Sequence, residues 1–126
     1  MRAALAIGGL SPADIDYVNL HGTGTKANDA MENLAMVEVF GTATPCSSTK
    51  GWTGHTLGAS GILEAVIAGL CIGHGLIPGC LNVAAVDPTF QARVVVANEQ
   101  RPIRHVMSNA FGFGGVNCSL IFGIAT

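Results

Sequence analysis

The amino-acid sequence predicts an α/β fold in which a mixed five-stranded sheet carries helices packed on it. Short apolar runs, typical of strands, alternate with longer stretches in which apolar residues recur at helical spacing. Glycine-rich loops follow three of the predicted strands. The chain of 126 residues is long enough for one domain but short for two, so we expect residues 1–126 to form a single domain.

The first half of the chain predicts helices alternating with strands. Residues 1–10 are rich in alanine and predict a helix without an N-cap, which we expect of a segment cut from a longer polypeptide. Asn28 or Asp29 is the expected cap of the next helix, whose apolar positions include Leu34 and Phe40. The elements expected here are strands at 16–20 and 45–49 and helices at 28–40 and 56–72.

The second half predicts three further strands, after an irregular segment at 76–86. The strands are expected at 93–96, 105–109 and 116–122. In open α/β sheets the functional groups gather beyond the carboxyl ends of the strands. We therefore expect the three glycine-rich loops to converge on one site.

Composition excludes several classes of protein. Hydrophobic residues make up 49% of the chain and charged residues only 11%, against about 25% in a typical soluble domain. The most apolar stretch, Ile62–Gly73, contains Glu64 and is shorter than the roughly 20 residues of a membrane span, so we expect a buried helix and no membrane span. The net charge of −2 without a basic run argues against nucleic-acid binding. The start of the chain lacks the pattern of a secretory leader, so we expect a cytoplasmic protein.

The first motif is the loop His21-Gly22-Thr23-Gly24-Thr25. A histidine at the end of a strand, followed by glycines, presents its ring where a substrate can approach. A lone loop histidine is more often only hydrogen-bonded to backbone, so this motif needs the others beside it. The loop lacks the spacing of a phosphate-binding loop.

The second motif runs from Ser48 to Gly61 and contains Lys50 and His55. His55 is expected at the start of a long helix, whose positive end favours a neutral imidazole. A neutral imidazole with its N–H directed outward donates well to a developing enolate oxygen. Glu64, on the same helix, is the expected partner of Lys50; the alternative, a surface lysine, fits poorly in such uncharged surroundings.

The third motif is Asn109–Asn117, in which glycines surround Phe111 and Phe113. It predicts a mobile loop with bulky side chains, able to gate a site and to direct backbone N–H groups at a substrate oxygen. The alternative is a hairpin turn whose phenylalanines fill the core. The segment lies between strands and does not match a dinucleotide-binding loop.

Other chemistries find little support. Cys71, His74 and Cys80 do not have the spacing of a zinc site, so we expect no metal. The spacing of a serine-hydrolase elbow is absent. His105 opens a strand and is expected to be structural.

Together the three motifs closely resemble those of the C-terminal half of the β-ketoacyl-acyl-carrier-protein synthases, condensing enzymes with the thiolase-like fold. The motifs HGTGT, STKxxTGHxLGASG and SNxFGFGGxN follow in the same order, and the resemblance covers nearly the whole chain. It implies half of a thiolase-like fold and a decarboxylating Claisen condensation of an acyl thioester with malonyl-carrier protein. The product would serve fatty acid or polyketide synthesis.

The resemblance also implies roles for individual residues. His21 and His55 would bind the malonyl thioester carbonyl and stabilise the enolate formed as CO₂ leaves, and Lys50 would organise the pocket. The supporting and binding roles fall on further residues: Glu64 as partner of Lys50, Asp29 and Glu32 as structural acids, Thr23 and Thr25 on the phosphopantetheine arm, and Phe111, Gly112 and Phe113 in the gating loop.

The nucleophilic cysteine of this family belongs to an N-terminal half that the sequence does not contain. None of Cys46, Cys71, Cys80 and Cys118 has the expected context, and we expect four reduced thiols that cannot be acylated. The expected partners are an acyl carrier protein, the N-terminal half and, for the parent enzyme, a second copy. No cofactor is expected, because phosphopantetheine arrives on the carrier.

Two alternatives remain. The first is a non-catalytic module that only holds a carrier or pantetheine; retention of both histidines and the lysine argues against it. The second is a thiolase-like enzyme acting on coenzyme A thioesters without decarboxylation, which tends to carry a cysteine in the final glycine loop, where none occurs here. An apolar face left by the missing half also predicts self-association.

Overall fold

The computed structural model describes residues 1–124. Glycines end its principal helices: Gly9 after the first and Gly75 after the last both adopt the left-handed conformation that a glycine tolerates. In chain order the elements are α1 (Arg2–Gly8), β1 (Tyr17–Asn19), α2 (Lys26–Phe40), β2 (Pro45–Ser47), α3 (Lys50–Thr53), α4 (Ser60–His74), β3 (Leu76–Ile77), β4 (Arg93–Val94), β5 (Glu99–Gln100), β6 (His105–Phe111) and β7 (Asn117–Gly123). Short 3₁₀ turns lie at Pro12–Asp14, Leu57–Ala59 and Phe113–Gly115.

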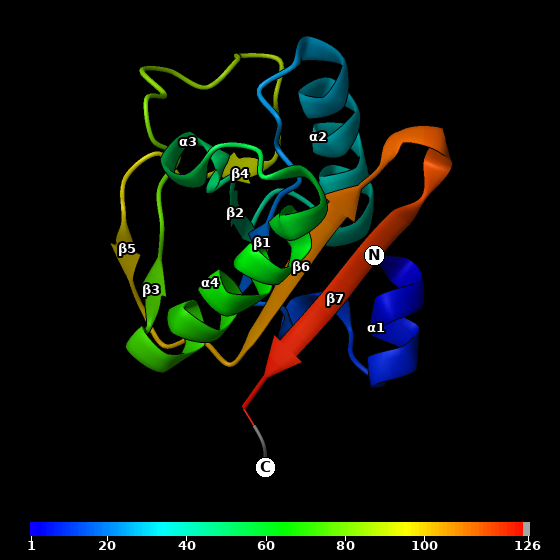
Figure 1. Cartoon of the computed structure of the whole chain (residues 1–126). Coiled ribbons are helices and arrows are strands. Elements are labelled where there is room, and N and C mark those ends of the chain that lie inside the picture. The colour runs from blue at the N-terminus through cyan, green and yellow to red at the C-terminus, as the bar shows by residue number, and fades with distance from the viewer. Residues whose placement is uncertain (125–126) are drawn as a thin grey trace.

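The main sheet has five strands in the order β4-β2-β1-β6-β7. The first four are parallel and β7 is antiparallel to β6, so the sheet is mixed as predicted. Because β1, β2 and β6 are parallel, their carboxyl ends share one edge, and the loop after each of them begins there. This edge lies at the top of Figure 1.

Helices cover the sheet on both faces (Figure 1). On one face, Leu5 of α1 and Met36 of α2 pack with Val18 and Met107 of the central strands. On the other face, Ala68 of α4 lies in a second cluster with residues of β1 and β6. The central strands are therefore buried on both sides.

Helix α2 differs from its prediction in its start and at Leu34, whereas Phe40 is buried as predicted. It begins at Lys26 with Thr25 in the capping position, so neither Asn28 nor Asp29 is its cap. Leu34 is 69% exposed, whereas Glu32 is buried beside Met36. The hydrophobic pattern was misleading because the buried face of α2 contains a carboxylate that serves the neighbouring loop.

A short helix and a two-stranded ribbon form in segments that were expected to be irregular. The residues directly after β2 form α3 rather than an open loop. Strands β3 and β5 pair as a separate antiparallel ribbon. Elements of two to four residues carry no recognisable period, so sequence patterns do not predict them.

The outward face of α4 is apolar and uncovered. Ile62, Val66 and Leu70 follow one another at four-residue steps and are 68%, 55% and 53% exposed. By length and hydropathy alone, Leu57–His74 qualifies as a candidate membrane helix, and only 22% of it is buried. The α-helical part is 15 residues long, about 22 Å, shorter than the roughly 30 Å of a bilayer core, and its other face packs on the sheet.

Candidate functional site

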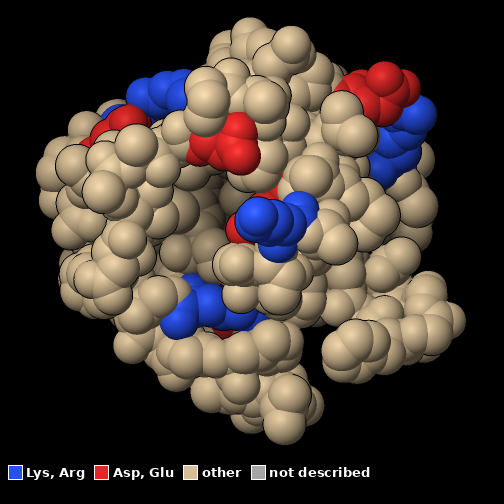
Figure 2. Space-filling view, turned by 90° about the horizontal axis from the view of Figure 1, so that it is seen from above, with Lys and Arg blue, Asp and Glu red and all other residues tan. Residues whose placement is uncertain are grey.

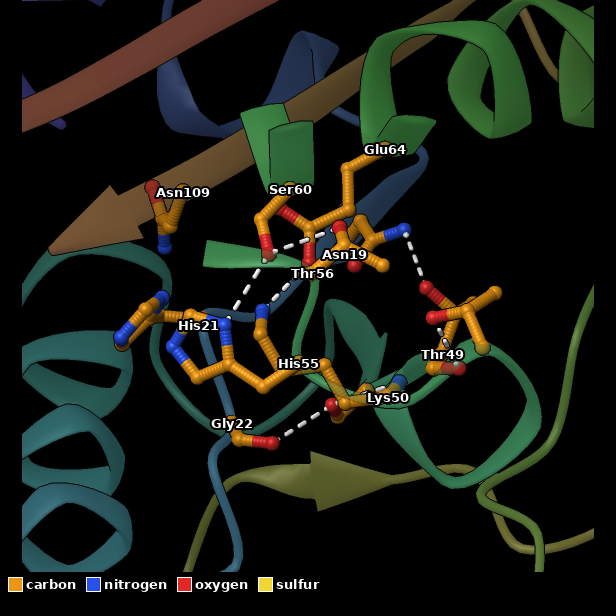
Figure 3. Close-up of polar contacts among 12 residues, drawn as sticks. Asn19, His21, Gly22, Thr49, Lys50, His55, Thr56, Ser60, Glu64 and Asn109 are labelled. Carbon is orange, nitrogen blue, oxygen red and sulfur yellow. Dashed lines mark hydrogen bonds and ion pairs between the residues drawn. The ribbon is translucent and has the colours of Figure 1, made fainter. Parts of the chain in front are cut away.

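The three motif loops converge at the carboxyl edge of the sheet (Figure 3). The ring of His21, after β1, lies 5.5 Å from that of His55 between centroids, edge-on at 86°. The ring of Phe111, at the end of β6, lies 5.8 Å from His21 on another side. The predicted convergence is confirmed.

Glu32 fixes the backbone that carries His21. Its buried carboxylate accepts hydrogen bonds from the N–H groups of His21 at 2.9 Å and Gly22 at 2.8 Å, and from Asn109 Nδ2 at 3.2 Å. Burial raises the pKa of the Glu32 carboxyl, and these donors lower it in part. One carboxylate thus joins α2, the first loop and β6.

Glycine is the residue type that fits at position 22. Its φ is +40°, and a Cβ built on it would lie 2.4 Å from Cβ of Ser48. The Ser48 hydroxyl donates to the Gly22 carbonyl oxygen at 2.7 Å. The first two loops are therefore held in direct contact.

His21 is buried, with 8% of its surface exposed. Burial lowers the pKa of its imidazole, and the positive charge of Lys50 and the neighbouring His55 lower it further. The ring is therefore neutral at pH 7. Its Nδ1 has no hydrogen-bond partner among the described residues.

His55 is solvent-exposed and contacts the protein through one ring nitrogen. Its Nδ1 lies 3.2 Å from the backbone nitrogen of Leu57 and 3.1 Å from the hydroxyl of Ser60. A backbone N–H can only donate, so Nδ1 accepts and the neutral ring carries its proton on Nε2. The prediction that His55 begins the long helix was wrong, because a 3₁₀ turn intervenes and α4 begins at Ser60.

Lys50 and Glu64 form a buried ion pair, as the sequence predicted. Lys50 begins α3 and Glu64 lies in the second turn of α4, with side-chain exposures of 6% and 2%. The second carboxylate oxygen of Glu64 has no partner among the described residues. The pair holds the Lys50 ammonium close enough to His21 for its charge to lower the pKa of that ring.

A hollow of about 740 Å³ opens at the surface and reaches Lys50 and His55. Figure 2 shows it surrounded mainly by uncharged residues, with a few acidic and basic groups at its rim. Thr23, Lys50 and His55 are among the residues that line it. Thr23 and Thr25 hydrogen-bond each other at 3.0 Å, and Asp29 accepts the N–H of Gly24 at 3.3 Å.

The gating loop is turned outward. Phe113 is fully exposed in its 3₁₀ turn, and the N–H of Gly112 donates to the Val116 carbonyl at 2.8 Å. Phe111, and not Phe113, is the aromatic ring against His21.

The cysteines lack the environment of a nucleophile. Burial raises the pKa of Cys46 to about 12 and that of Cys71 to about 11, and it also raises the pKa of Cys80. Cys118 is exposed on β7. Within residues 1–124 no three His, Cys, Asp or Glu side chains gather as a metal site requires.

Sequence reasoning assigned no role to three polar residues of the site: Ser60, Asn109 and Asn19. Ser60 contacts His55, and Asn109 binds Glu32 and accepts the Ser119 hydroxyl at 2.8 Å. Asn19, fully buried at the end of β1, donates to Thr49 Oγ1 at 3.3 Å. For Asn19 the available signal was a polar residue at the end of a short strand.

Comparison with known proteins identifies the family. Residues 1–84 match the model of the β-ketoacyl synthase C-terminal domain. The mitochondrial 3-oxoacyl-[acyl-carrier-protein] synthase of Arabidopsis thaliana is 46% identical over 129 residues, covering 97% of this chain and 28% of the relative.

Solved structures agree with this assignment. The ishigamide ketosynthase/chain length factor superposes with a TM-score of 0.95 at 38% identity, covering 99% of this chain and 32% of the other. A ketosynthase of Xenorhabdus doucetiae, solved in complex with its chain length factor, gives 0.91 at 46% identity, with coverage of 99% and 32%. These likenesses confirm the predicted thiolase-like half, and the chain spans about 30% of the length of these relatives. The chain belongs to the β-ketoacyl synthase family and corresponds to the C-terminal part of its members.

Proposed function

We propose that this chain supplies the decarboxylating half of a β-ketoacyl-acyl-carrier-protein synthase. The observation that carries the proposal is the edge-on pair of His21 and His55, with the buried Lys50–Glu64 pair beside it. The substrate would be a malonyl thioester on an acyl carrier protein, entering through the hollow past Thr23.

The chemistry follows from the charge that develops during the reaction. Loss of CO₂ leaves a carbanion that is stabilised only as an enolate, and the enolate oxygen needs hydrogen-bond donors already in place. Two neutral imidazoles provide them: the pKa of His21 is lowered, and the proton of His55 lies on Nε2 because Nδ1 accepts from Leu57. One such donor is worth about 3–4 kcal/mol of barrier.

The acyl-transfer half of the reaction requires a thiolate that this chain does not supply. Buried thiols whose pKa values are raised to about 11 and 12, as in Cys71 and Cys46, stay protonated at neutral pH. The nucleophile would come from the N-terminal part of the parent enzyme. Complete condensation, dimerisation of the parent and a choice between fatty acid and polyketide products therefore belong to the longer protein.

Several expectations accompany the proposal. No cofactor or metal ion is required, because the carrier brings its own phosphopantetheine. A non-catalytic carrier-binding module is disfavoured, because simple binding does not need two histidines beside a buried lysine. We expect a cytoplasmic enzyme, although one relative is named as mitochondrial.

The test is CO₂ release from malonyl-carrier protein by the chain itself. Release above the rate in buffer is expected, with loss in His21→Ala and in His55→Ala. His74→Ala is the matched control, since His74 is exposed at the far end of α4. Release that is absent, or equal in all four proteins, would assign the activity to the longer enzyme and not to this chain.

A further inference from the structure

We propose that Ser60 is a positioning residue for His55: its hydroxyl, donating to Nδ1, fixes the plane of the ring and keeps the proton on Nε2. The inference deepens the proposed function. The catalytic role of His55 rests on that proposal, whereas the hydrogen bonding of its ring does not.

Few other contacts hold the His55 ring in place. His55 is exposed and lies in the connection between α3 and α4, which contains two left-handed residues, Gly54 at φ +72° and Leu57 at φ +53°. Both hydrogen bonds that the described residues make to the ring reach Nδ1. The edge contact with His21 is the remaining restraint.

The two hydrogen bonds to Nδ1 have similar lengths, 3.2 Å from Leu57 and 3.1 Å from Ser60, and differ in the backbone that carries each donor. The Leu57 N–H sits on an exposed turn with a strained backbone. Ser60 is 5% exposed and begins α4, a helix of 15 residues. Among residues 1–124, Ser60 is thus the one side chain that hydrogen-bonds the ring, and it belongs to a long helix; its contact with His55 is drawn in Figure 3.

The Leu57 contact determines which atom donates in each of the neighbouring hydrogen bonds. Since Leu57 donates to Nδ1, that nitrogen carries no proton, and the Ser60 hydroxyl near it must also donate. The Ser60 oxygen is then free to accept from Thr56 Oγ1, which lies 3.3 Å away. The hydroxyl pair of Thr56 and Ser60 therefore ends in a donor aimed at Nδ1, and Nε2–H is left for the reaction site.

Helix α4 consequently positions both functional groups of the second motif. Ser60 and Glu64 are four residues apart and lie on one buried face, where Ser60 binds His55 and Glu64 binds Lys50. A change in how α4 packs on the sheet would therefore move the imidazole of His55 and the ammonium of Lys50 together.

The test is the tautomer of His55, measured on the chain labelled with ¹⁵N-histidine by long-range ¹H–¹⁵N NMR, with the resonances assigned through His55→Gln. The unaltered chain and Ser60→Thr are expected to show mainly the Nε2–H tautomer, with a minor Nδ1–H population. Ser60→Ala loses one neutral hydrogen bond, and the Nδ1–H population should rise about five- to tenfold. Ser60→Cys, with a weaker donor of similar size, should shift in the same direction and serves if the alanine variant does not fold.

An unchanged tautomer ratio in Ser60→Ala or Ser60→Cys, at a melting temperature close to that of the parent chain, would overturn the inference. The measurement does not depend on catalysis. A tautomer shift without CO₂ release would therefore support the role of Ser60 while refuting the proposed function.

Discussion

Removing either partner of the buried Lys50–Glu64 pair should destabilise the chain strongly. The side chains are 6% and 2% exposed, so Lys50→Met leaves a buried carboxylate, and Glu64→Leu a buried ammonium, without its counter-charge. Such a loss typically costs about 3–5 kcal/mol, equivalent to roughly 10–20 °C in melting temperature for a chain of this length. Urea unfolding at pH 7, followed by circular dichroism, measures it.

The double variant Lys50→Met/Glu64→Leu separates burial of charge from pairing. Two apolar side chains of similar volume should restore stability to within about 1–2 kcal/mol of the unaltered chain. Arg2→Met is the matched control, because Arg2 pairs with Glu38 at 68% and 69% side-chain exposure and should cost less than about 1 kcal/mol. The reasoning would be refuted if each single variant lost as little free energy of unfolding as the Arg2→Met control. It would also be refuted if the double variant lost as much as the two single variants together.

Three further predictions address the thiols, pH and self-association. In the folded chain Cys118 should react with iodoacetamide, while Cys46 and Cys71 react only after unfolding; mass spectrometry of the alkylated protein locates the label. Because the pKa of His21 is lowered from 6.5 in the folded chain, the unfolded chain binds more protons near and below that pH, and the free energy of unfolding should fall as the pH drops from 7. His21→Asn should make the free energy of unfolding depend less on pH, and an equal slope in both proteins would contradict this role of His21. The exposed apolar face of α4 should drive self-association that Val66→Glu weakens, and a clean monomer in sedimentation of the unaltered chain would contradict this.

The sequence predicted the sheet well because its strands are buried on both faces. The neighbours Tyr17 and Val18 of β1 pack on opposite faces of the sheet, as do Val106 and Met107 of β6, which is the pattern of a strand covered by helices on each side. The loops after β1, β2 and β6 also converge as expected, since parallel strands end at one edge. Helix α2 was predicted correctly at Phe40, which is buried, but wrongly at Leu34, which is exposed, because no hydrophobic pattern places a carboxylate such as Glu32 in a core.

The candidate site was predicted unevenly. His21, Lys50 and His55 stand out because charged or titratable side chains are rare in this chain, and Glu64 is the one acid in the apolar helix. Ser60 gave no comparable signal, since a serine at a helix start has many structural uses. Its role depends on a turn between His55 and α4 that residue spacing alone did not predict.

The exposed apolar residues and the exposed His55 lie on neighbouring elements of the chain. Ile62 and Val66 of α4 and Leu120 of β7 are exposed, on elements that contact each other, and His55 is exposed at the amino end of the same helix. Hydrogen bonds to a developing oxyanion are weaker where water competes, because the local dielectric constant is high. A chain that supplies about 30% of its relatives' length and leaves His55 open to solvent should therefore stabilise an enolate less than the same residues would behind a covering surface. Release of CO₂ by this chain should accordingly be slow, and its dependence on His21 and His55, not its absolute rate, is what distinguishes a catalytic half from a binding module.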